Sequence, residues 1–285
     1  MTSFVKASSR ALKKIPIVRR PVLFLQRVIV ASSYYKRPLI QMVRWFWRSR
    51  ENTNFTYDLT EGNKDYMAAF ISEITGKTFE EVRGYIRELE QDSWLVAHIK
   101  QMAHENAYGH VTDPEIWFCK RLGWYALVRA QKPAVTVETG VDKGLGSCVI
   151  SRALERNEEE GRPGVYYGTD INPEAGYLFA GRLRKFGKLL IGDSLESLRN
   201  LKGQIDIFIN DSDHSAEYER AEYEVVFEKL SAGAIILGDN AHVTDELLKF
   251  SLKHQRSFLF FQEKPRDHWY PGGGIGASFK KTSCR

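Results

Sequence analysis

Apolar residues along this chain follow one pattern before Pro133 and another after it. Before Pro133 they recur every three or four positions, which is the spacing of an amphipathic helix. Thr78-Phe-Glu-Glu81 is a capping box that should start one of these helices, and Asp113 followed by Pro114 should start another. The segments that we expect to be helical are 63–75, from 78 onward, 93–105 and 113–130.

After Pro133 the apolar runs are short and alternate with helical stretches. A chain that alternates strands and helices folds as an α/β protein with a parallel, doubly wound sheet. Ligands of such sheets bind at the carboxyl ends of the strands. The seven runs that we expect to be strands are 135–138, 165–170, 189–193, 205–209, 234–237, 257–262 and 274–279.

These patterns divide the chain into three parts. Residues 1–50 are a basic amphipathic arm, residues 51–112 a helical cap, and residues 113–285 the α/β domain. A length of 285 residues fits one large domain with additions. The hydrophobic content of 43% is enough for a packed core.

The net charge of +5 is distributed unevenly. Residues 1–50 contain 12 Lys and Arg and no acid, which leaves 29 basic and 36 acidic residues in the remainder of the chain. The positive charge therefore belongs to the arm. The arm has no run of the ~18–20 apolar residues that a membrane-spanning helix needs, and no cleavage site of a secretory signal follows a long apolar core.

Three interpretations of the arm are open on the sequence. Basic helices with Trp and Phe lie in the headgroup region of anionic membranes, so a membrane surface is one candidate partner. Alternatively, the arm packs on the domain or on a second subunit, which would make the protein a homo-oligomer. An Arg- and Ser-rich start without acids is also typical of an organellar transit peptide. No nucleic-acid-reading module accompanies the charge, so we expect no nucleic acid partner.

The three cysteines, Cys119, Cys148 and Cys284, are scattered and form no CxxC pair. Neither a disulfide framework nor a zinc site is therefore expected. A reducing compartment follows, and we expect a cytoplasmic location, peripheral to a membrane if the arm binds lipid.

One stretch, which begins at Val135, combines an apolar run, an acid and a glycine turn. Glu138 is followed by Gly140, Gly144 and Gly146, and a helical stretch begins directly after them. A strand, a glycine turn and a helix in this order can hold a nucleotide-like ligand, because glycine tolerates positive φ and a close ligand. The spacing is G-x-x-x-G-x-G, whereas a dinucleotide-binding fold has G-x-G-x-x-G. The difference argues against an NAD(P)-dependent reductase.

Polar residues follow each of the first five expected strands. Any one of these acids alone is more often a loop cap or an N-cap, but five at one edge of a sheet indicate a ligand crevice. An acid after the second strand can accept hydrogen bonds from both ribose hydroxyls of a nucleoside. The polar strand ends are Glu138 to Gly140, Asp170, Asp193-Ser194, Asn210 to His214, and Asp239 to His242.

With these residues in view, residues 113–285 resemble the class I S-adenosylmethionine (SAM)-dependent methyltransferases. The likeness is closest to the metal-dependent O-methyltransferases of the catechol and caffeoyl-CoA type and to their sugar and antibiotic relatives. It implies a Rossmann-like sheet of seven strands, mostly parallel, with the last strand antiparallel. It also implies that Glu138 and the backbone of 140–146 face the methionine part of SAM, that Asp170 holds the ribose, and that Asp193 and Ser194 face the adenine.

The same resemblance implies a divalent cation, with Mg²⁺ as the first candidate. Asp211, Asp239 and Asn240 match the family's ligand positions, and oxygen ligands suit a hard cation. Asp213 is the competing ligand. The alternative is that Asp239 and Asn240 cap a helix while Asp211 only orients its loop.

A hydroxyl acceptor is a poor nucleophile until its proton leaves, and histidine titrates near neutral pH. We therefore expect His214 to be the general base, beside Asp211, with His242 as the second candidate. Many relatives have Lys at the position of His214, so the resemblance does not fix its role. His268, Trp269 and Tyr270 are candidates for the acceptor pocket, or else a hairpin loop.

The sequence therefore predicts a metal-assisted, SAM-dependent O-methyltransferase. The acceptor that we expect is a hydroxyl of a sugar, a glycolipid or a secondary metabolite, since the arm could bring the site to a lipid-borne substrate. The rivals are a non-catalytic methyltransferase-like binding protein and an NAD(P)-dependent reductase.

Overall fold

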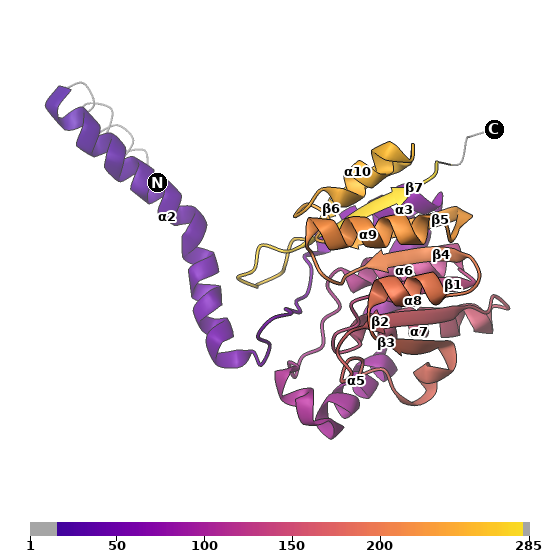
Figure 1. Cartoon of the computed structure of the whole chain (residues 1–285). Helices are drawn as coiled ribbons and strands as arrows, with labels where there is room; N and C mark the ends of the chain where they lie inside the picture. The colour runs from indigo at the N-terminus through magenta and orange to yellow at the C-terminus, as the bar shows by residue number, and fades with distance from the viewer. Residues whose placement is uncertain (1–15, 282–285) are drawn as a thin grey trace. The chain divides into compact units, whose positions relative to one another are not determined.

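The computed structural model describes residues 16–281, and its chain divides into two compact units (Figure 1). The first contains the arm up to Ser49 together with Asp267–Tyr270, and the second contains Arg50–Arg266 with the chain from Pro271 onward. The expected helical cap, residues 51–112, is part of the second unit and does not form a unit of its own.

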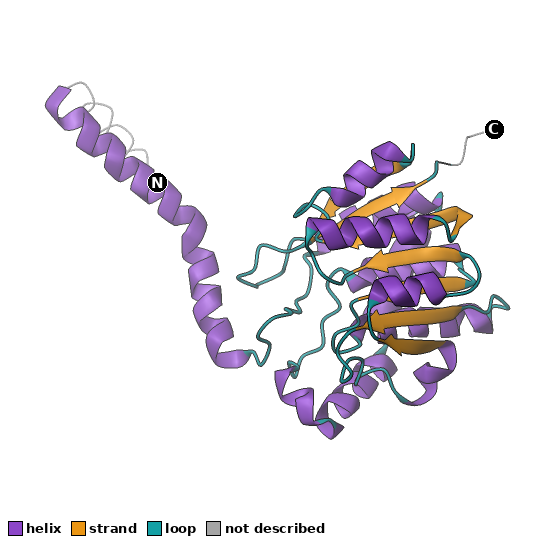
Figure 2. Cartoon of the chain, in the orientation of Figure 1, coloured by secondary structure: helices purple, strands orange, loops and turns teal. Residues whose placement is uncertain are grey.

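The second unit is built on one seven-stranded sheet with helices on both faces (Figure 2). The strand order is β3-β2-β1-β4-β5-β7-β6, and only β7 runs antiparallel to its neighbours. The predicted α/β fold, with its antiparallel last strand, is confirmed. The strands are β1 (Val135–Thr139), β2 (Val165–Asp170), β3 (Gly187–Ile191), β4 (Ile205–Asn210), β5 (Leu230–Asp239), β6 (Ser257–Gln262) and β7 (Gly274–Phe279).

The central strands are buried on both faces, which explains their continuous apolar runs. In β4, Ile207 and Phe208 point to opposite faces of the sheet and are both fully buried. Phe208 belongs to a core shared with Tyr223 and Phe250 of the covering helices. Full burial of one such side chain contributes about 1.5–3 kcal/mol, so this core fixes the strand ends that carry the polar residues.

Two groups of helices pack within this unit. In one group, α6 contacts α3, α4 and α7; in the other, α9 contacts α8 and α10. The helices are α3 (Glu61–Thr75), α4 (Phe79–Glu90), α5 (Ser93–Glu105), α6 (Arg121–Gln131), α7 (Leu145–Glu159), α8 (Ser194–Asn200), α9 (Ala216–Phe227) and α10 (Glu246–Lys253), with 3₁₀ turns η1 (Ala107–Val111) and η2 (Gly181–Phe186).

Local capping chemistry sets the helix ends where the sequence predicts them. The capping box of α4 is complete: Glu81 N donates to Thr78 Oγ1 at 3.2 Å, and Thr78 N donates to the Glu81 carboxylate at 3.0 Å. Gly76 ends α3 in the left-handed conformation at φ 69°. These two features confirm the predicted start of α4 and the end of α3.

The helix expected over 113–130 begins instead at Arg121. The Asp113 carboxylate does not cap it, because Asp113 Oδ1 accepts a hydrogen bond from the Arg50 backbone N–H at 2.5 Å. Residues 113–120 are irregular, and their route places Lys120 and Arg121 in the interior. The Asp113 side chain therefore caps no helix here and instead binds a backbone N–H that lies 63 residues earlier in the chain.

The first unit consists mainly of one long helix, α2 (Pro16–Arg48). Its Trp45 ring lies 5.3 Å from Trp269 and 6.5 Å from His268, and Arg37 pairs with Asp267 at 2.7 Å. The expected acceptor-pocket residues 268–270 thus belong to the unit of the arm. Among the described residues, no helix is both long and apolar enough to cross a membrane.

Candidate active site

The turn after β1 requires its glycines. Gly140 has φ 82°, and a Cβ there would lie 1.9 Å from the Asp211 carbonyl oxygen. A Cβ on Gly146 would lie 2.1 Å from Glu138 Oε1. Gly144, at φ 93°, is the N-cap of α7. The glycines therefore allow the chain to pass close to both the neighbouring loop and the Glu138 side chain.

Glu138 lies beneath this turn and is buried. Its carboxylate accepts a short hydrogen bond from the Tyr166 hydroxyl, and that hydroxyl also pairs with Ser147 Oγ at 2.7 Å. Burial raises the pKa of Glu138 to about 7. The expected methionine-facing acid is therefore buried near the start of α7 and is not among the residues that line the cleft described next.

A cleft lies at the carboxyl ends of β1, β2, β3 and β4. Asp170 is held at its edge by two backbone donors, Asp142 N and Asn172 N, each at 2.8 Å. Ile171 beside it is 80% exposed, an unusual position for an apolar side chain and one that the sequence analysis did not single out. The cleft is lined by Gly140, Asp142, Thr169, Asp170, Ile171, Asn172, Gly192, Asp193, Ser194, Asp211, Ser212, Asp213 and Tyr218.

Asp193 and Ser194 reach this cleft but also have structural partners. Asp193 caps α8 by accepting from Glu196 N at 2.9 Å, and it accepts from the Tyr218 hydroxyl at 3.1 Å. Ser194 Oγ lies 2.8 Å from the Tyr218 hydroxyl and donates to Glu222. Tyr218 is thus a further cleft residue, and its aromatic ring gives the cleft a second apolar surface next to Ile171.

A buried acid, Glu222 of α9, ties the strand ends together. It accepts hydrogen bonds from Thr139 at 3.1 Å and from Ser212 at 2.9 Å, and also from Ser194 and Asn210. Burial raises the pKa of Glu222, which these donors oppose. Sequence reasoning missed Glu222 because one acid on an otherwise mixed helix looks like a solvated side chain.

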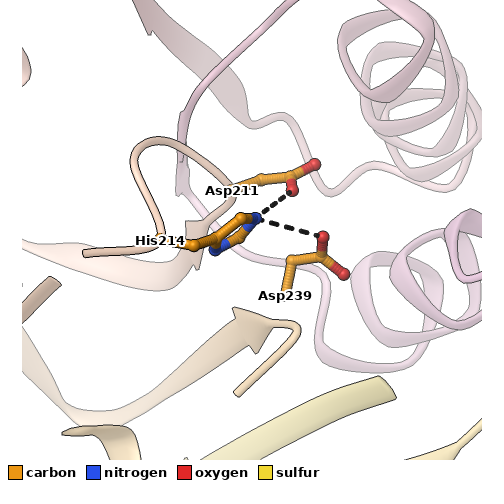
Figure 3. Close-up of side chains that lie close together, drawn as sticks. All are labelled: Asp211, His214 and Asp239. Carbon is orange, nitrogen blue, oxygen red and sulfur yellow. Dashed lines mark ion pairs between the residues drawn. The ribbon is translucent and has the colours of Figure 1, made fainter. Parts of the chain in front are cut away.

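Three side chains converge at the ends of β4 and β5, and one of them, Asp211, also lines the cleft (Figure 3). His214 Nε2 lies 4.0 Å from Asp211 Oδ1 and 3.8 Å from Asp239 Oδ2. Asp239 Oδ1 is buried and has no hydrogen-bond partner among the described residues. Asn240 follows with φ 49°, and its Nδ2 donates to Asp239 Oδ2 at 2.9 Å.

Lys120 joins this cluster from the irregular segment before α6. Its ammonium lies 3.1 Å from Asp211 Oδ1 and contacts Asp239 Oδ2 even more closely. Lys120 was not predicted, since it lies 91 residues from Asp211 in the sequence and in no recognised motif. Its positive charge offsets part of the negative charge of the two carboxylates.

The two carboxylates compete for the charged state. Burial and the neighbouring negative charge of Asp239 raise the pKa of Asp211. Burial opposes ionisation of Asp239 too, but the Lys120 ammonium keeps the pKa of Asp239 low. The Lys120 ammonium and the nearby Arg121 guanidinium both lie close enough to Asp211 and Asp239 to favour their charged forms.

His214 is oriented by a second carboxylate. Its Nδ1 lies 3.2 Å from Glu219 Oε1, and Thr244 donates to the other oxygen of Glu219. The hydrogen bond to Glu219 raises the pKa of His214. With the proton on Nδ1, the Nε2 lone pair faces Asp211 and Asp239.

The structure separates the remaining predicted residues from this cluster. His242 is exposed, with its ring 5.3 Å from Phe260. Asp213, the competing metal ligand, is exposed and accepts from Ser215 N at 2.9 Å, as in an ordinary Asx turn. Asp211, His214 and Asp239, with Asn240 hydrogen-bonded to Asp239, are thus the predicted metal and catalytic residues that come together.

Comparisons with known proteins agree with this architecture. Residues 137–241 match a family model described as a methyltransferase domain. The O-methyltransferase from Bacillus cereus, solved in complex with SAH, has a TM-score of 0.53 and 15% identity over 65% of this chain and 91% of that chain. The cofactor-bound protein Rv0187 from MTB has a TM-score of 0.52 and 16% identity over 67% of this chain and 92% of that chain. No curated protein matches the sequence.

The sheet unit therefore has the class I fold of the SAM-dependent O-methyltransferases. Within this unit, the part of the chain that is similar to a methyltransferase domain by sequence is residues 137–241.

Proposed function

We propose that this protein transfers a methyl group from SAM to a hydroxyl oxygen, with the help of a divalent cation. The observation that carries the proposal is the position of Asp211. This residue lines the cleft at the ends of β1–β4 and also belongs to the cluster with His214 and Asp239. A ligand in the cleft would therefore meet the acid–histidine cluster directly.

The cleft offers the groups that an adenosyl ligand needs. Asp170 can accept from ribose hydroxyls, because its carboxylate is already fixed by two backbone N–H groups and needs no reorganisation. Ile171 and Tyr218 provide apolar surfaces for a flat base. Asp193 and Ser194 border the same space, and the turn at Gly140 allows close approach of the methionine part.

The cluster fits a hard divalent cation such as Mg²⁺. Asp211 and Asp239 supply carboxylate oxygens, and Asn240 supplies an amide oxygen once its side chain turns toward the site. The partnerless, buried Oδ1 of Asp239 supports this assignment, since such an atom is costly unless a cation or donor satisfies it. When bound, the cation would lower the pKa of an acceptor hydroxyl.

The protein's own contribution is to position the reactants and to accept a proton. His214 Nε2 can take the proton of the acceptor hydroxyl, while Glu219 holds the ring through Nδ1. The displacement at the methyl carbon needs the acceptor oxygen, carbon and sulfur in line, so the rate depends on positioning. Asp211 stands between the two ligands and helps to set that line.

For the acceptor we propose a hydroxyl of a sugar, a glycolipid or a secondary metabolite. The basic arm supports a lipid-linked acceptor at a cytoplasmic membrane surface. A non-catalytic binding protein is the rival, although the complete cluster with its oriented His214 has no evident purpose in a protein that only binds SAM.

Calorimetry of SAM binding with Mg²⁺ and with EDTA tests the proposal. We expect SAM to bind and NADH not to bind. The Asp211→Ala and Asp239→Ala variants should each lower methylation of hydroxyl acceptors by roughly 10²-fold or more, while Asp239→Ala retains SAM binding, with His242→Ala as the control. Tight NADH binding or no SAM binding would overturn the proposal. Unchanged SAM-dependent turnover in EDTA would contradict only the role of the cation and leave the methyl transfer in place.

A further inference from the structure

The helix α2 separates its charges from its apolar side chains. At about 100° per residue, most of the large apolar residues fall on one arc roughly 160° wide and the arginines fall on the opposite side, where Leu23, Val30, Tyr34 and Trp45 lie among them. Lys36 is the one basic residue of the described helix that lies on the apolar arc. The apolar arc carries Phe24, Leu25, Val28, Ile29, Tyr35, Leu39, Ile40, Val43, Phe46 and Trp47, and the other side carries Arg19, Arg20, Arg27, Arg37, Arg44 and Arg48.

The apolar arc is open to solvent. Phe24 is 65% exposed and Trp47 is 87% exposed, and the other large residues of the arc are also exposed. The contacts of the arm with residues 267–270 use the other side of the helix, where Arg37 pairs with Asp267 and Trp45 packs on Trp269. An exposed apolar surface of this size marks an interaction site in a soluble protein.

We propose that α2 lies in the headgroup region of an anionic membrane, with this apolar arc among the acyl chains and the arginines among the lipid phosphates. The arc has the composition of interfacial helices: aromatic and aliphatic residues on one side, Arg on the other, and no acid. Two prolines, Pro21 and Pro38, lie inside the helix. The helix changes direction along its length (Figure 1), and a bent helix can follow a membrane surface.

A second copy of the chain is a poorer occupant of the same surface. A two-helix seam uses a narrow apolar stripe, whereas this arc is broad and aromatic. Pairing two arms through their apolar arcs would also leave the seven Lys and Arg of each α2 without a neutralising acid in either helix, because α2 contains none. An anionic lipid surface supplies that missing negative charge. This inference does not rest on the proposed enzymatic activity.

Two valines of α2 give a matched test. Val28, 44% exposed, lies on the apolar arc, and Val30, 57% exposed, lies on the arginine side, so the same Val→Gln change can be made on either side. With the full-length protein and phosphatidylcholine vesicles containing phosphatidylserine, Val28→Gln should lower the partition coefficient about tenfold. Val30→Gln should change it less than about twofold. Circular dichroism checks that both variants keep their helix.

The charge requirement is tested with the lipid. Removing phosphatidylserine from the vesicles should weaken binding strongly, and Arg27→Gln should weaken it about fivefold on anionic vesicles only. Equal binding by Val28→Gln and Val30→Gln, or equal binding by the full chain and one without residues 1–49, would overturn the proposal. A lipid-free dimer that Val28→Gln dissociates would also overturn it, in favour of pairing between arms.

Discussion

The carboxylates at the two ends of the candidate site, near β2 and near β5, have opposite environments. At the β2 end, Asp170 is partly exposed and held only by the backbone donors Asp142 N and Asn172 N. At the β5 end, Asp239 is buried against the Lys120 ammonium and a second acid, Asp211. Backbone donors fix a carboxylate without occupying its outer face, so Asp170 stays available for hydroxyls.

Buried carboxylates behave differently, because water does not solvate their charge and a protein group or an ion must stabilise it. Lys120 pairs with both Asp211 and Asp239, and the Arg121 guanidinium adds a second positive charge near them. In the proposed function, the β2 end recognises a neutral polyol such as a ribose, and the β5 end concentrates positive charge beside the acceptor. The predictions below separate the two ends.

The largest effect is expected from Asp239→Ala. This change removes a ligand of the proposed cation and leaves Lys120 and Asp211 mispaired, so methyl transfer should fall by roughly 10²-fold or more. The measurement is initial rate against Mg²⁺ concentration. Glu228→Ala, at an exposed acid outside the cleft lining, is the control and should keep its rate. A normal Mg²⁺ response in Asp239→Ala would contradict the assignment.

Lys120→Met should mainly lower stability. Removing the ammonium leaves two buried carboxylates without their partner, which costs about 3 kcal/mol. Denaturant unfolding in EDTA should reveal the loss, and added Mg²⁺ should restore more stability to the variant than to the wild type. Lys188→Met, at an exposed lysine, should change neither quantity. If Mg²⁺ stabilises both proteins equally, Lys120 and the cation do not share these carboxylates.

Asp170→Ala should act on the other end alone. The loss of charge-assisted hydrogen bonds to the ribose predicts a cofactor affinity about 10–100-fold weaker. Calorimetry of SAM and of Mg²⁺ separates the effects, since only the first should change. Glu174→Ala, at an exposed acid outside the cleft lining, is the matched control. A parallel loss of Mg²⁺ binding would mean that the two ends are not independent.

The smallest effect should be a displaced pH profile in Glu219→Gln. Glu219 raises the pKa of His214 through their hydrogen bond, so the protonated ring, which cannot act as a base, persists to higher pH. The neutral amide of Gln should lower this pKa and move the acid limb of kcat/KM to lower pH. The raised pKa of His214 also contributes to the free energy of unfolding. It stabilises the folded protein below the pKa of the unfolded state, and this stabilisation is lost as pH rises through the folded-state pKa. An unmoved acid limb would exclude His214 as the titrating base.

Much of the architecture could be predicted because its signals are local. Alternating strands and helices predicted the sheet, and Thr78 with Glu81 predicted the start of α4. The glycine turn was also readable, since Gly140 must adopt a positive φ. The start of α6 could not be predicted, because Asp113 has the chemistry of an N-cap but its carboxylate accepts a hydrogen bond from the Arg50 backbone N–H instead.

The candidate site divides in the same way. Its acids were predicted at the strand ends, since the carboxyl ends of parallel strands meet at one edge. Whether His214 or His242 joins them depends on loop geometry that spacing alone cannot give. Glu222 was unreadable because nothing in its own helix shows that donors from several other segments will surround it.

The alternation of strands and helices, the Thr78 cap, the glycine turn and the basic arm could be read from the sequence alone, because each depends on neighbours within a few residues. Only the tertiary structure decided that Lys120 lies between Asp211 and Asp239 and that Glu219 holds His214. The physical reason is that side-chain charge acts through space. Its partner is set by packing across the fold, and 91 residues of chain separate the lysine from the first of its acids.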